Sequence, residues 1–240
     1  MIINSRASRH LAVNCVAACL PVLFVGCQQR KEAETETSAP EIVIDRLVLG
    51  RLQTNCYCLR AATTAKDCLI MDTGADHVEP LIDFLKENSL EPAAVIFTHG
   101  HFDHVNGVTL LCEHFPRIRA VIHKADGAAL AGKVKESRIH FVEKDGPIEF
   151  AGIKLEVFHT PGHTPGGISL YLRCRGVVFT GDSLFAGSVG RTDLEDGSFK
   201  ELIKGIKEKL LVLAEETVVY PGHGPSTTIG KEKRSNQYLR

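Results

Sequence analysis

The sequence contains no tryptophan, and aromatic residues make up only 6% of its 240 residues. This scarcity argues against a large surface for stacking nucleobases or sugars. No charge of either sign dominates, because 28 Lys and Arg residues against 29 Asp and Glu residues leave a net charge of −1. An even balance gives no overall attraction to nucleic acid or to an acidic membrane surface, so we expect no nucleic-acid partner.

The N-terminal part lacks the run of about twenty apolar residues that a membrane-spanning helix needs. Its apolar stretch, LAVNCVAACLPVLFVG, is shorter, contains Pro21 and follows a start with two arginines and no acid. A basic start, a short apolar stretch and a small residue before a cleavage point are typical of an export signal. The sequence therefore predicts a signal peptide over residues 1–27 and a protein of the bacterial cell envelope, lipid-anchored or periplasmic. If the signal interpretation is wrong, the protein would be cytoplasmic.

The end of this stretch, FVGC, resembles the lipobox of bacterial lipoproteins, in which a Cys after a small residue is lipidated. Cys27 is the predicted lipidation site, although Phe24 stands where a lipobox usually has Leu. A plain anchor or an over-extended start is the alternative. Residues 28–41 are polar and have no apolar period, so we expect a disordered linker there. The ordered domain is expected over residues 42–240.

No CxxC pair occurs among the eight cysteines, and five of them lie beyond the export region. We expect these five to be small buried thiols, although export would permit a disulfide whose pairing the sequence cannot assign. Cys56 and Cys58 alternate along a predicted strand and should face the same side of it.

The ordered part begins with three predicted strands, at residues 42–50, 55–61 and 68–72, which are β-branched or alternating in polarity. Asp76 is the predicted N-cap of a first helix, with Glu79 as the acid three residues on. A second helix is predicted to start at Ser198 with Glu201 as its capping partner. No internal repeat appears, so we expect one domain of mixed strands and helices.

The same local pattern recurs at four places in this domain. The apolar runs AVIF, KLEVF, GVVF and TVVY end in THGHFDH, HTPGHTPGG, TGDS and PGHGP, respectively. Each is a short predicted strand that stops at a turn containing His or Asp. Because strand ends placed side by side in a sheet bring such turns into one cleft, we expect the side chains to meet.

The residues that these turns deliver point to a metal centre. They comprise five imidazoles and two carboxylates: His99, His101, Asp103, His104, His163, Asp182 and His223. A single tetrahedral zinc would be filled by four ligands, so seven suit two ions that share a carboxylate. Nitrogen and oxygen donors without thiolate suit zinc, iron or manganese.

These motifs, together with Asp72 in MDTG, resemble those of the metallo-β-lactamase superfamily across residues 42–228. The resemblance implies a single α/β (α+β) domain, a four-layer αββα sandwich with metals at one edge between two sheets. The tract GDSLFAGSVGRTD with PGHGPSTT is most similar to short bacterial glyoxalase II-like hydrolases.

By this resemblance, two divalent ions, zinc before iron or manganese, would occupy the site. The first would be bound by His99, His101 and His163, the second by Asp103, His104 and His223, with Asp182 between them. Asp72 would orient a ligand by a hydrogen bond, or simply cap the turn after its strand. Arg191 could bind a substrate carboxylate, or pair with Asp193 instead.

The implied activity is hydrolysis of a thioester or ester, such as S-lactoylglutathione, by hydroxide that the metals make available. Asp103 is the predicted catalytic residue, which would orient the nucleophile or take up its proton. Two features oppose this substrate. Only seventeen residues follow His223, so the C-terminal helical region of full-length glyoxalase II enzymes is missing. An exported protein would also not meet a cytosolic thioester.

Several other functions stay open on the sequence alone. Persulfide dioxygenases share the HxHxDH motif and use one iron, and a lactonase is a second enzymatic alternative. A true β-lactamase is disfavoured by Asp182, because one class would have Cys there and the others generally lack this acid. A metal-binding lipoprotein without turnover is the non-enzymatic alternative. The acyl group, the thiol carrier and the oligomeric state are not predicted.

Overall fold

The computed structural model describes residues 41–194 and 196–240. The predicted signal peptide, the lipidation of Cys27 and the predicted linker up to residue 40 lie outside the described residues, so they stay predictions. Within the described part, none of the helices has the length and apolar character required to cross a bilayer.

The first half of the domain forms a six-stranded mixed sheet in the order β1-β2-β3-β4-β5-β6. Neighbouring strands run antiparallel from β1 to β3 and parallel from β3 to β6. The strands are β1 (Val43–Leu49), β2 (Thr54–Arg60), β3 (Asp67–Met71), β4 (Glu91–Ile96), β5 (Arg119–His123) and β6 (Ile139–Val142). The helices of this half are α1 (Glu79–Glu87), α2 (Phe102–Val105) and α3 (Val108–His114), followed by the 3-10 turns η1 (Lys124–Leu130) and η2 (Glu136–Arg138).

The second half forms another six-stranded sheet in the order β14-β13-β10-β9-β8-β7. Only the pair β10–β13 is parallel in it. Its strands are β7 (Gly146–Phe150), β8 (Ile153–His159), β9 (Ile168–Leu172), β10 (Val177–Gly181), β13 (Val218–Pro221) and β14 (Thr227–Thr228). The remaining elements are η3 (Arg173–Arg175), the hairpin β11 (Leu184–Phe185) and β12 (Ser188–Val189), α4 (Phe199–Gly205) continued by η4 (Ile206–Leu210), and α5 (Ile229–Ser235).

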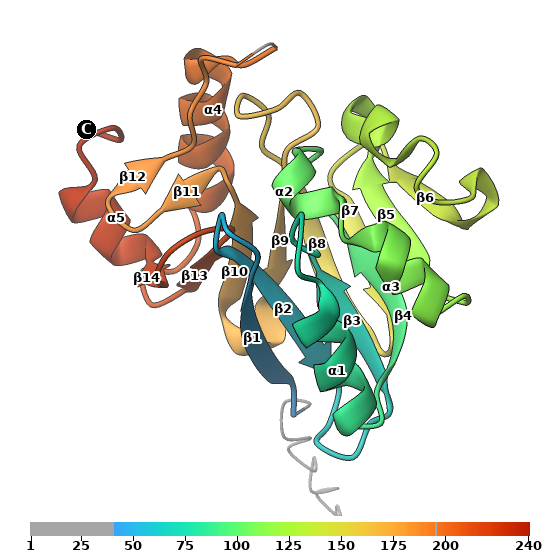
Figure 1. The fold of residues 1–240 in the computed structure, drawn as a ribbon. Coiled ribbons are helices and arrows are strands. Elements are labelled where there is room, and N and C mark those ends of the chain that lie inside the picture. Colours follow the sequence, from blue (N-terminus) through green and yellow to red (C-terminus); the bar gives the residue numbers. More distant parts are fainter. Residues whose placement is uncertain (1–40, 195) are drawn as a thin grey trace, which may run out of the picture. The chain divides into compact units, whose positions relative to one another are not determined.

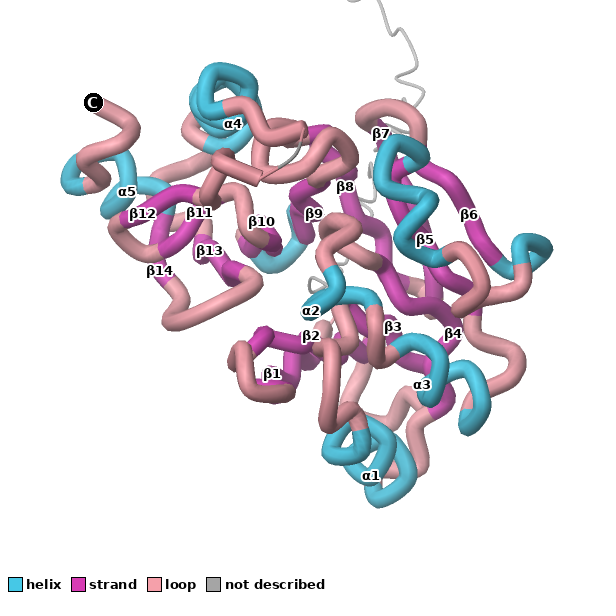
Figure 2. The backbone as a smooth tube through the Cα atoms, turned by 45° about the horizontal axis from the view of Figure 1, so that its top comes forward, coloured by secondary structure: helices cyan, strands magenta, loops and turns pink. Residues whose placement is uncertain are grey.

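Three apolar layers hold the sheets and helices together. One lies between the first sheet and the helices α1 and α3, one between the two sheets, and one between the second sheet and the helices α4 and α5. Figure 2 shows α1 and α3 on one outer side and α4 and α5 on the other, with both sheets between them. The predicted αββα sandwich is therefore confirmed, since each sheet buries one face on the other sheet and one on helices.

Strand β2 shows how the sequence produces this layering. Its residues alternate between two clusters: Cys56 and Cys58 pack into the helix-side layer, whereas Tyr57 and Leu59 pack between the sheets. Because side chains alternate across a strand, both faces of β2 are buried, and residues 56–59 contribute to an apolar layer on each side. The prediction that Cys56 and Cys58 face the same side is confirmed.

The cysteine thiols of this layer are structural. Cys56, Cys58 and Cys68 are fully buried, and no disulfide forms among the cysteines that the structure describes. Burial raises the pKa of the Cys56 thiol, and a hydrogen bond with Cys58 raises that of Cys68. Thiols that resist ionisation are poor metal ligands and poor nucleophiles. The expectation of buried thiols fails only for Cys174, which is exposed.

The predicted cap of the first helix is wrong. Helix α1 begins at Glu79 with Val78 as its N-cap and no capping side chain, because His77 takes a left-handed conformation with φ of 57°. Asp76 instead accepts a hydrogen bond from the backbone N–H of Arg51. The predicted cap of the second helix is confirmed, since the Ser198 hydroxyl accepts from the Glu201 N–H at 3.3 Å.

Candidate metal centre

The four motif-bearing turns meet at one edge of the sandwich, next to α2 (Figure 1). They follow β4 in the first sheet and β8, β10 and β13 in the second. The two sheets are joined there by a hydrogen bond from the Ile168 N–H to the Thr98 carbonyl, at 2.8 Å. The expectation that these strand ends bring their side chains together is confirmed by ligand atoms that lie within 4.8 Å of one another.

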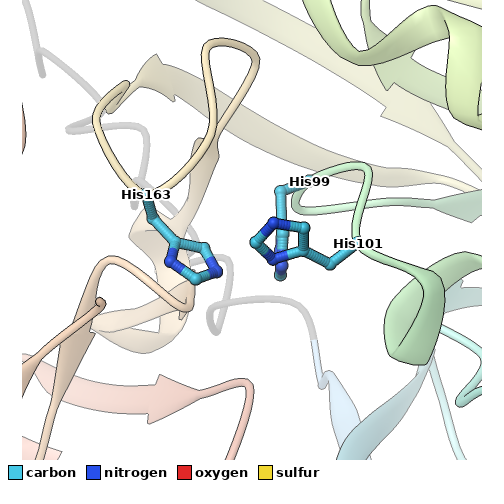
Figure 3. Close-up of side chains that lie close together, drawn as sticks. All are labelled: His99, His101 and His163. Carbon is cyan, nitrogen blue, oxygen red and sulfur yellow. The ribbon is translucent and has the colours of Figure 1, made fainter. Parts of the chain in front are cut away.

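A first group of possible ligands consists of His99, His101 and His163, whose ligand atoms all lie within 4.8 Å of one another. Figure 3 shows the three imidazoles facing a common space, His163 from the second sheet and the other two from the loop after β4. The His163 Nδ1 donates to the Arg191 carbonyl at 2.8 Å. Its Nε2, and that of His99, are buried without a hydrogen-bond partner. Buried unpaired nitrogens are costly, and a cation between them would satisfy both.

A second group consists of Asp103, His104 and His223, again with ligand atoms within 4.8 Å. The Nε2 atoms of His104 and His223 lie 3.2 Å apart, and the His223 Nε2 lies 3.1 Å from Asp103 Oδ2. The Nδ1 of His223 donates to the Leu52 carbonyl at 3.0 Å, which leaves its Nε2 free to bind a cation.

Asp182 lies between the two groups. Its Oδ2 is 3.5 Å from the His163 Nε2 and 3.6 Å from the His223 Nε2, while its Oδ1 is 3.5 Å from the His104 Nε2. The Oδ1 is also buried and has no hydrogen-bond partner. A carboxylate that reaches both groups and is unsatisfied in protein alone has the placement of a ligand shared by two ions.

The local charges favour cations in this space. Burial, together with the imidazole of His104, holds the pKa of His99 well below its usual value. Burial alone would also lower the pKa of His104, but the carboxylates of Asp72 and Asp182 outweigh it and raise that pKa to about 9. Protons therefore supply the positive charge that the carboxylates attract when no cation is bound. Several ligand atoms are buried without a hydrogen-bond partner, and they lie in two groups close to clustered carboxylates. This arrangement is consistent with a binuclear metal site.

Asp72 supports the second group from behind. Its Oδ2 accepts from the His104 Nδ1 and from the Thr98 hydroxyl, both at 2.8 Å, and its Oδ1 accepts from the Thr98 N–H at 2.9 Å. The carboxylate thus contacts a candidate ligand, as the resemblance implied. Its bonds to Thr98 hold the turn after β4 rather than the turn after its own strand, β3.

We expect Asp72→Asn to lower cation affinity or activity about 10- to 100-fold, the usual effect of losing a carboxylate partner of a ligating histidine. Asparagine tolerates the left-handed backbone of this position, where φ is 56°, so the fold should be retained. Isothermal titration with zinc measures the change. Asp145→Asn is the matched control, because Asp145 accepts a backbone N–H from His159 and contacts no candidate ligand. Equal affinities in the two variants would contradict a supporting role for Asp72.

Arg191 does not point freely into the site. Its guanidinium forms two hydrogen bonds of 2.8 Å to the carboxylate of Asp193, and both side chains are exposed. The bond with Arg191 lowers the pKa of Asp193 to about 2. The salt-bridge alternative is therefore the one that the structure displays, and binding of a substrate carboxylate by Arg191 stays a prediction.

The residues that hold the PGHGP turn were not predicted from the sequence. The Asn55 side chain donates to the carbonyls of Pro221 and Gly224 at 2.9 and 3.0 Å, and its backbone N–H donates to the Gly222 carbonyl at 2.7 Å. The Tyr57 hydroxyl donates to the Pro221 carbonyl at 2.8 Å. Strand β2 thereby fixes the turn that carries His223, although more than 160 residues separate them along the chain.

A four-layer sandwich with histidines and aspartates at one edge between the sheets defines the metallo-β-lactamase fold class. Residues 49–223 match the family model of the metallo-beta-lactamase superfamily. The chain therefore belongs to the metallo-β-lactamase superfamily.

Three relatives give this assignment more detail. The hydroxyacylglutathione hydrolase GloC of Haemophilus influenzae is 35% identical over 209 residues, which cover 82% of this chain and 97% of GloC. The crystal structure of BLEG-1, titled a B3 metallo-beta-lactamase, matches with a TM-score of 0.73 at 36% identity over 82% of this chain and 99% of that one. TTHA1623, in a di-iron-bound form, matches with a TM-score of 0.70 at 36% identity over 81% of this chain and all of that one (100%). Site and relatives together support a metal-dependent hydrolase.

Proposed function

We propose that the protein is a zinc-dependent hydrolase of thioesters or activated esters, with an S-lactoylglutathione-type thioester as the first-choice substrate. The observation that carries this proposal is the Asp182 carboxylate, which lies within 3.6 Å of a histidine of each ligand group. A site built for two adjacent cations suits hydrolysis of a carbonyl compound.

The chain's own residues would share the work as follows. His99, His101 and His163 would hold one cation, and Asp103, His104 and His223 the other, with Asp182 touching both. When bound, such cations lower the pKa of water from 15.7 to about 7 and polarise a carbonyl oxygen. The protein's part is to fix the ligands at one sheet edge and keep the attacking water close to Asp103.

Asp103 is placed to take up a proton during the attack. Burial raises the pKa of Asp103, but the hydrogen bond with His223 and the charge of His104 outweigh it and lower that pKa. A carboxylate at this place could accept a hydrogen bond from the nucleophilic water. A thioester suits this arrangement because a thiolate leaves without needing a proton from the enzyme.

The similarity to GloC supports the glutathione thioester. The match covers 97% of GloC, so almost all of GloC corresponds to a part of this chain. The short segment after His223 is then no obstacle to such a substrate. The similarity to BLEG-1 favours β-lactams as a second candidate substrate class, to be compared in the same assays.

The test is a metal and substrate survey of the purified full-length protein. We expect about two zinc ions per chain and hydrolysis of S-lactoylglutathione faster than that of simple esters, lactones or a chromogenic cephalosporin. Activity should follow the zinc content when the metal is removed with a chelator and added back, and magnesium should not replace it.

Other outcomes would overturn parts of the proposal. One iron per chain with oxygen uptake on glutathione persulfide would identify a dioxygenase instead. Faster cleavage of the cephalosporin than of any thioester would favour a β-lactamase. Bound metal without turnover of any of these compounds would favour a non-catalytic metal-binding protein.

A further inference from the structure

A buried carboxylate outside the predicted ligand set lies behind the first group of histidines. Asp126, in η1, is only 8% exposed. One of its oxygens accepts from the Gly100 N–H and from the Thr164 hydroxyl, and the other accepts from the Gly166 N–H, all at 2.7 Å. Among the described residues, no Lys or Arg forms an ion pair with it, so the carboxylate is satisfied by these three donors.

The three donors belong to the two loops that carry the first ligand group. Gly100 lies between His99 and His101 in the loop after β4, whereas Thr164 directly follows His163 in the loop after β8. These loops come from different sheets. Asp126 therefore connects three segments, and every ligand of the first group is next to a residue that it binds.

The backbone at Gly100 and Gly166 packs tightly against this carboxylate. A Cβ added at Gly100 would lie 3.0 Å from the Asp126 Cβ, and one added at Gly166 would lie 2.5 Å from its Cγ and Oδ1. The glycines of THGHFDH and HTPGG thus let the backbone N–H groups approach the acid closely. Short bonds to a charged acceptor hold a loop more firmly than neutral ones.

We infer that Asp126 is a positioning residue that holds the loops of His101 and His163 together and thereby sets the cation affinity of the first ligand group. This inference rests on the proposed metal site. The ligand atoms of the three histidines lie within 4.8 Å of one another. His101 and His163, however, are on loops that follow strands of different sheets. Asp126 contacts both loops directly, so without it the histidines of the first group could move apart. The second group would keep the hydrogen bonds of His104 to Asp72 and of His223 to Leu52.

The test measures zinc binding in the absence of substrate, in full-length protein. Asp126→Asn is combined with His223→Ala, which weakens the second group, and separately with His101→Ala, which weakens the first. Asparagine keeps one acceptor oxygen, so it cannot serve all three donors. We expect Asp126→Asn to lower zinc affinity about 10- to 100-fold in the His223→Ala background and to leave it unchanged in the His101→Ala background.

Glu232→Gln is the matched control. Glu232 is also fully buried and accepts from three donors, the Gly187 N–H at 2.9 Å, the Thr227 hydroxyl at 2.6 Å and the Asn236 side chain at 2.9 Å. None of its donors is next to a candidate ligand in the sequence. This variant should lower the melting temperature without changing zinc affinity. If both variants reduce zinc affinity equally, Asp126 is only a general packing residue and the inference is wrong.

Two further measurements keep the inference testable. If Asp126→Asn does not fold, Thr164→Val removes one of the three bonds and should still lower zinc affinity several-fold in the His223→Ala background; unchanged affinity would overturn the inference. Zinc binding by the wild type without thioester hydrolysis would refute the proposed substrate, whereas a weaker Asp126→Asn site would still support the positioning role. A wild-type protein that binds no zinc would overturn both.

Discussion

Replacing Asp182 by alanine is expected to lower thioester turnover by about two to three orders of magnitude, the range seen when one electrostatic partner of a transition state is removed. The physical reason is its position: this carboxylate lies within 3.6 Å of His104, His163 and His223, so it contacts histidines of both ligand groups. Without it, both ligand groups would lose a carboxylate that lies within reach of their histidines.

The measurement is kcat/KM for the best thioester together with zinc per chain, with circular dichroism to show that the fold survives. Asp83→Ala is the control, because Asp83 is exposed on helix α1 and contacts no site residue. Retained activity in Asp182→Ala would remove the shared carboxylate from the mechanism, and with it the argument for two cooperating ions.

Gly222→Ala is expected to reduce activity by about 100-fold, the scale of loss that follows when reacting groups are displaced by about 1 Å. A Cβ at this position would collide with the Asp182 Oδ1 and would lie 2.8 Å from the His104 Cε1. The backbone cannot simply withdraw, since the Gly222 N–H donates to the Gly181 carbonyl at 2.8 Å and its carbonyl accepts from Asn55. One methyl group therefore pushes on the carboxylate between the two groups and on a histidine of the second group.

Gly205→Ala provides the comparison for this substitution. Gly205 lies in helix α4, where an added Cβ would be no closer than 3.4 Å to any neighbour, an ordinary contact. Alanine there should keep full activity and slightly raise the melting temperature, because it favours the helix by up to about 1 kcal/mol over glycine. Equal activities in the two alanine variants would mean that the space around Asp182 does not matter for catalysis.

The candidate ligands were predictable from the sequence because imidazole and carboxylate side chains are distinctive and follow recognisable apolar strands. THGHFDH alone supplies four of the seven, and the strand ends at β8, β10 and β13 supply the others. The layers were predictable only through the resemblance, since alternating strands do not say which sheet they join.

The supports of the site could not be predicted in the same way. Asn55 and Asp126 act on backbone N–H and carbonyl groups, which every residue offers, so no side-chain pattern marks their partners. The cap predicted at Asp76 failed for a related reason. The acid is held by Arg51 on the β1–β2 hairpin, a tertiary contact that a local motif does not contain.

The two ligand groups, and a third set formed by His99, His104 and Asp182, each take two residues from the loop after β4 or from helix α2. The remaining residue of each set comes from the second sheet. Neither half of the polypeptide therefore supplies a complete set of ligands, and a bound ion would connect the two sheets. An ion that binds the folded domain but not the unfolded chain raises the free energy of unfolding by mass action. The increase is about 2.7 kcal/mol at an ion concentration 100 times the dissociation constant. Cation binding should therefore increase the resistance of the folded domain to unfolding.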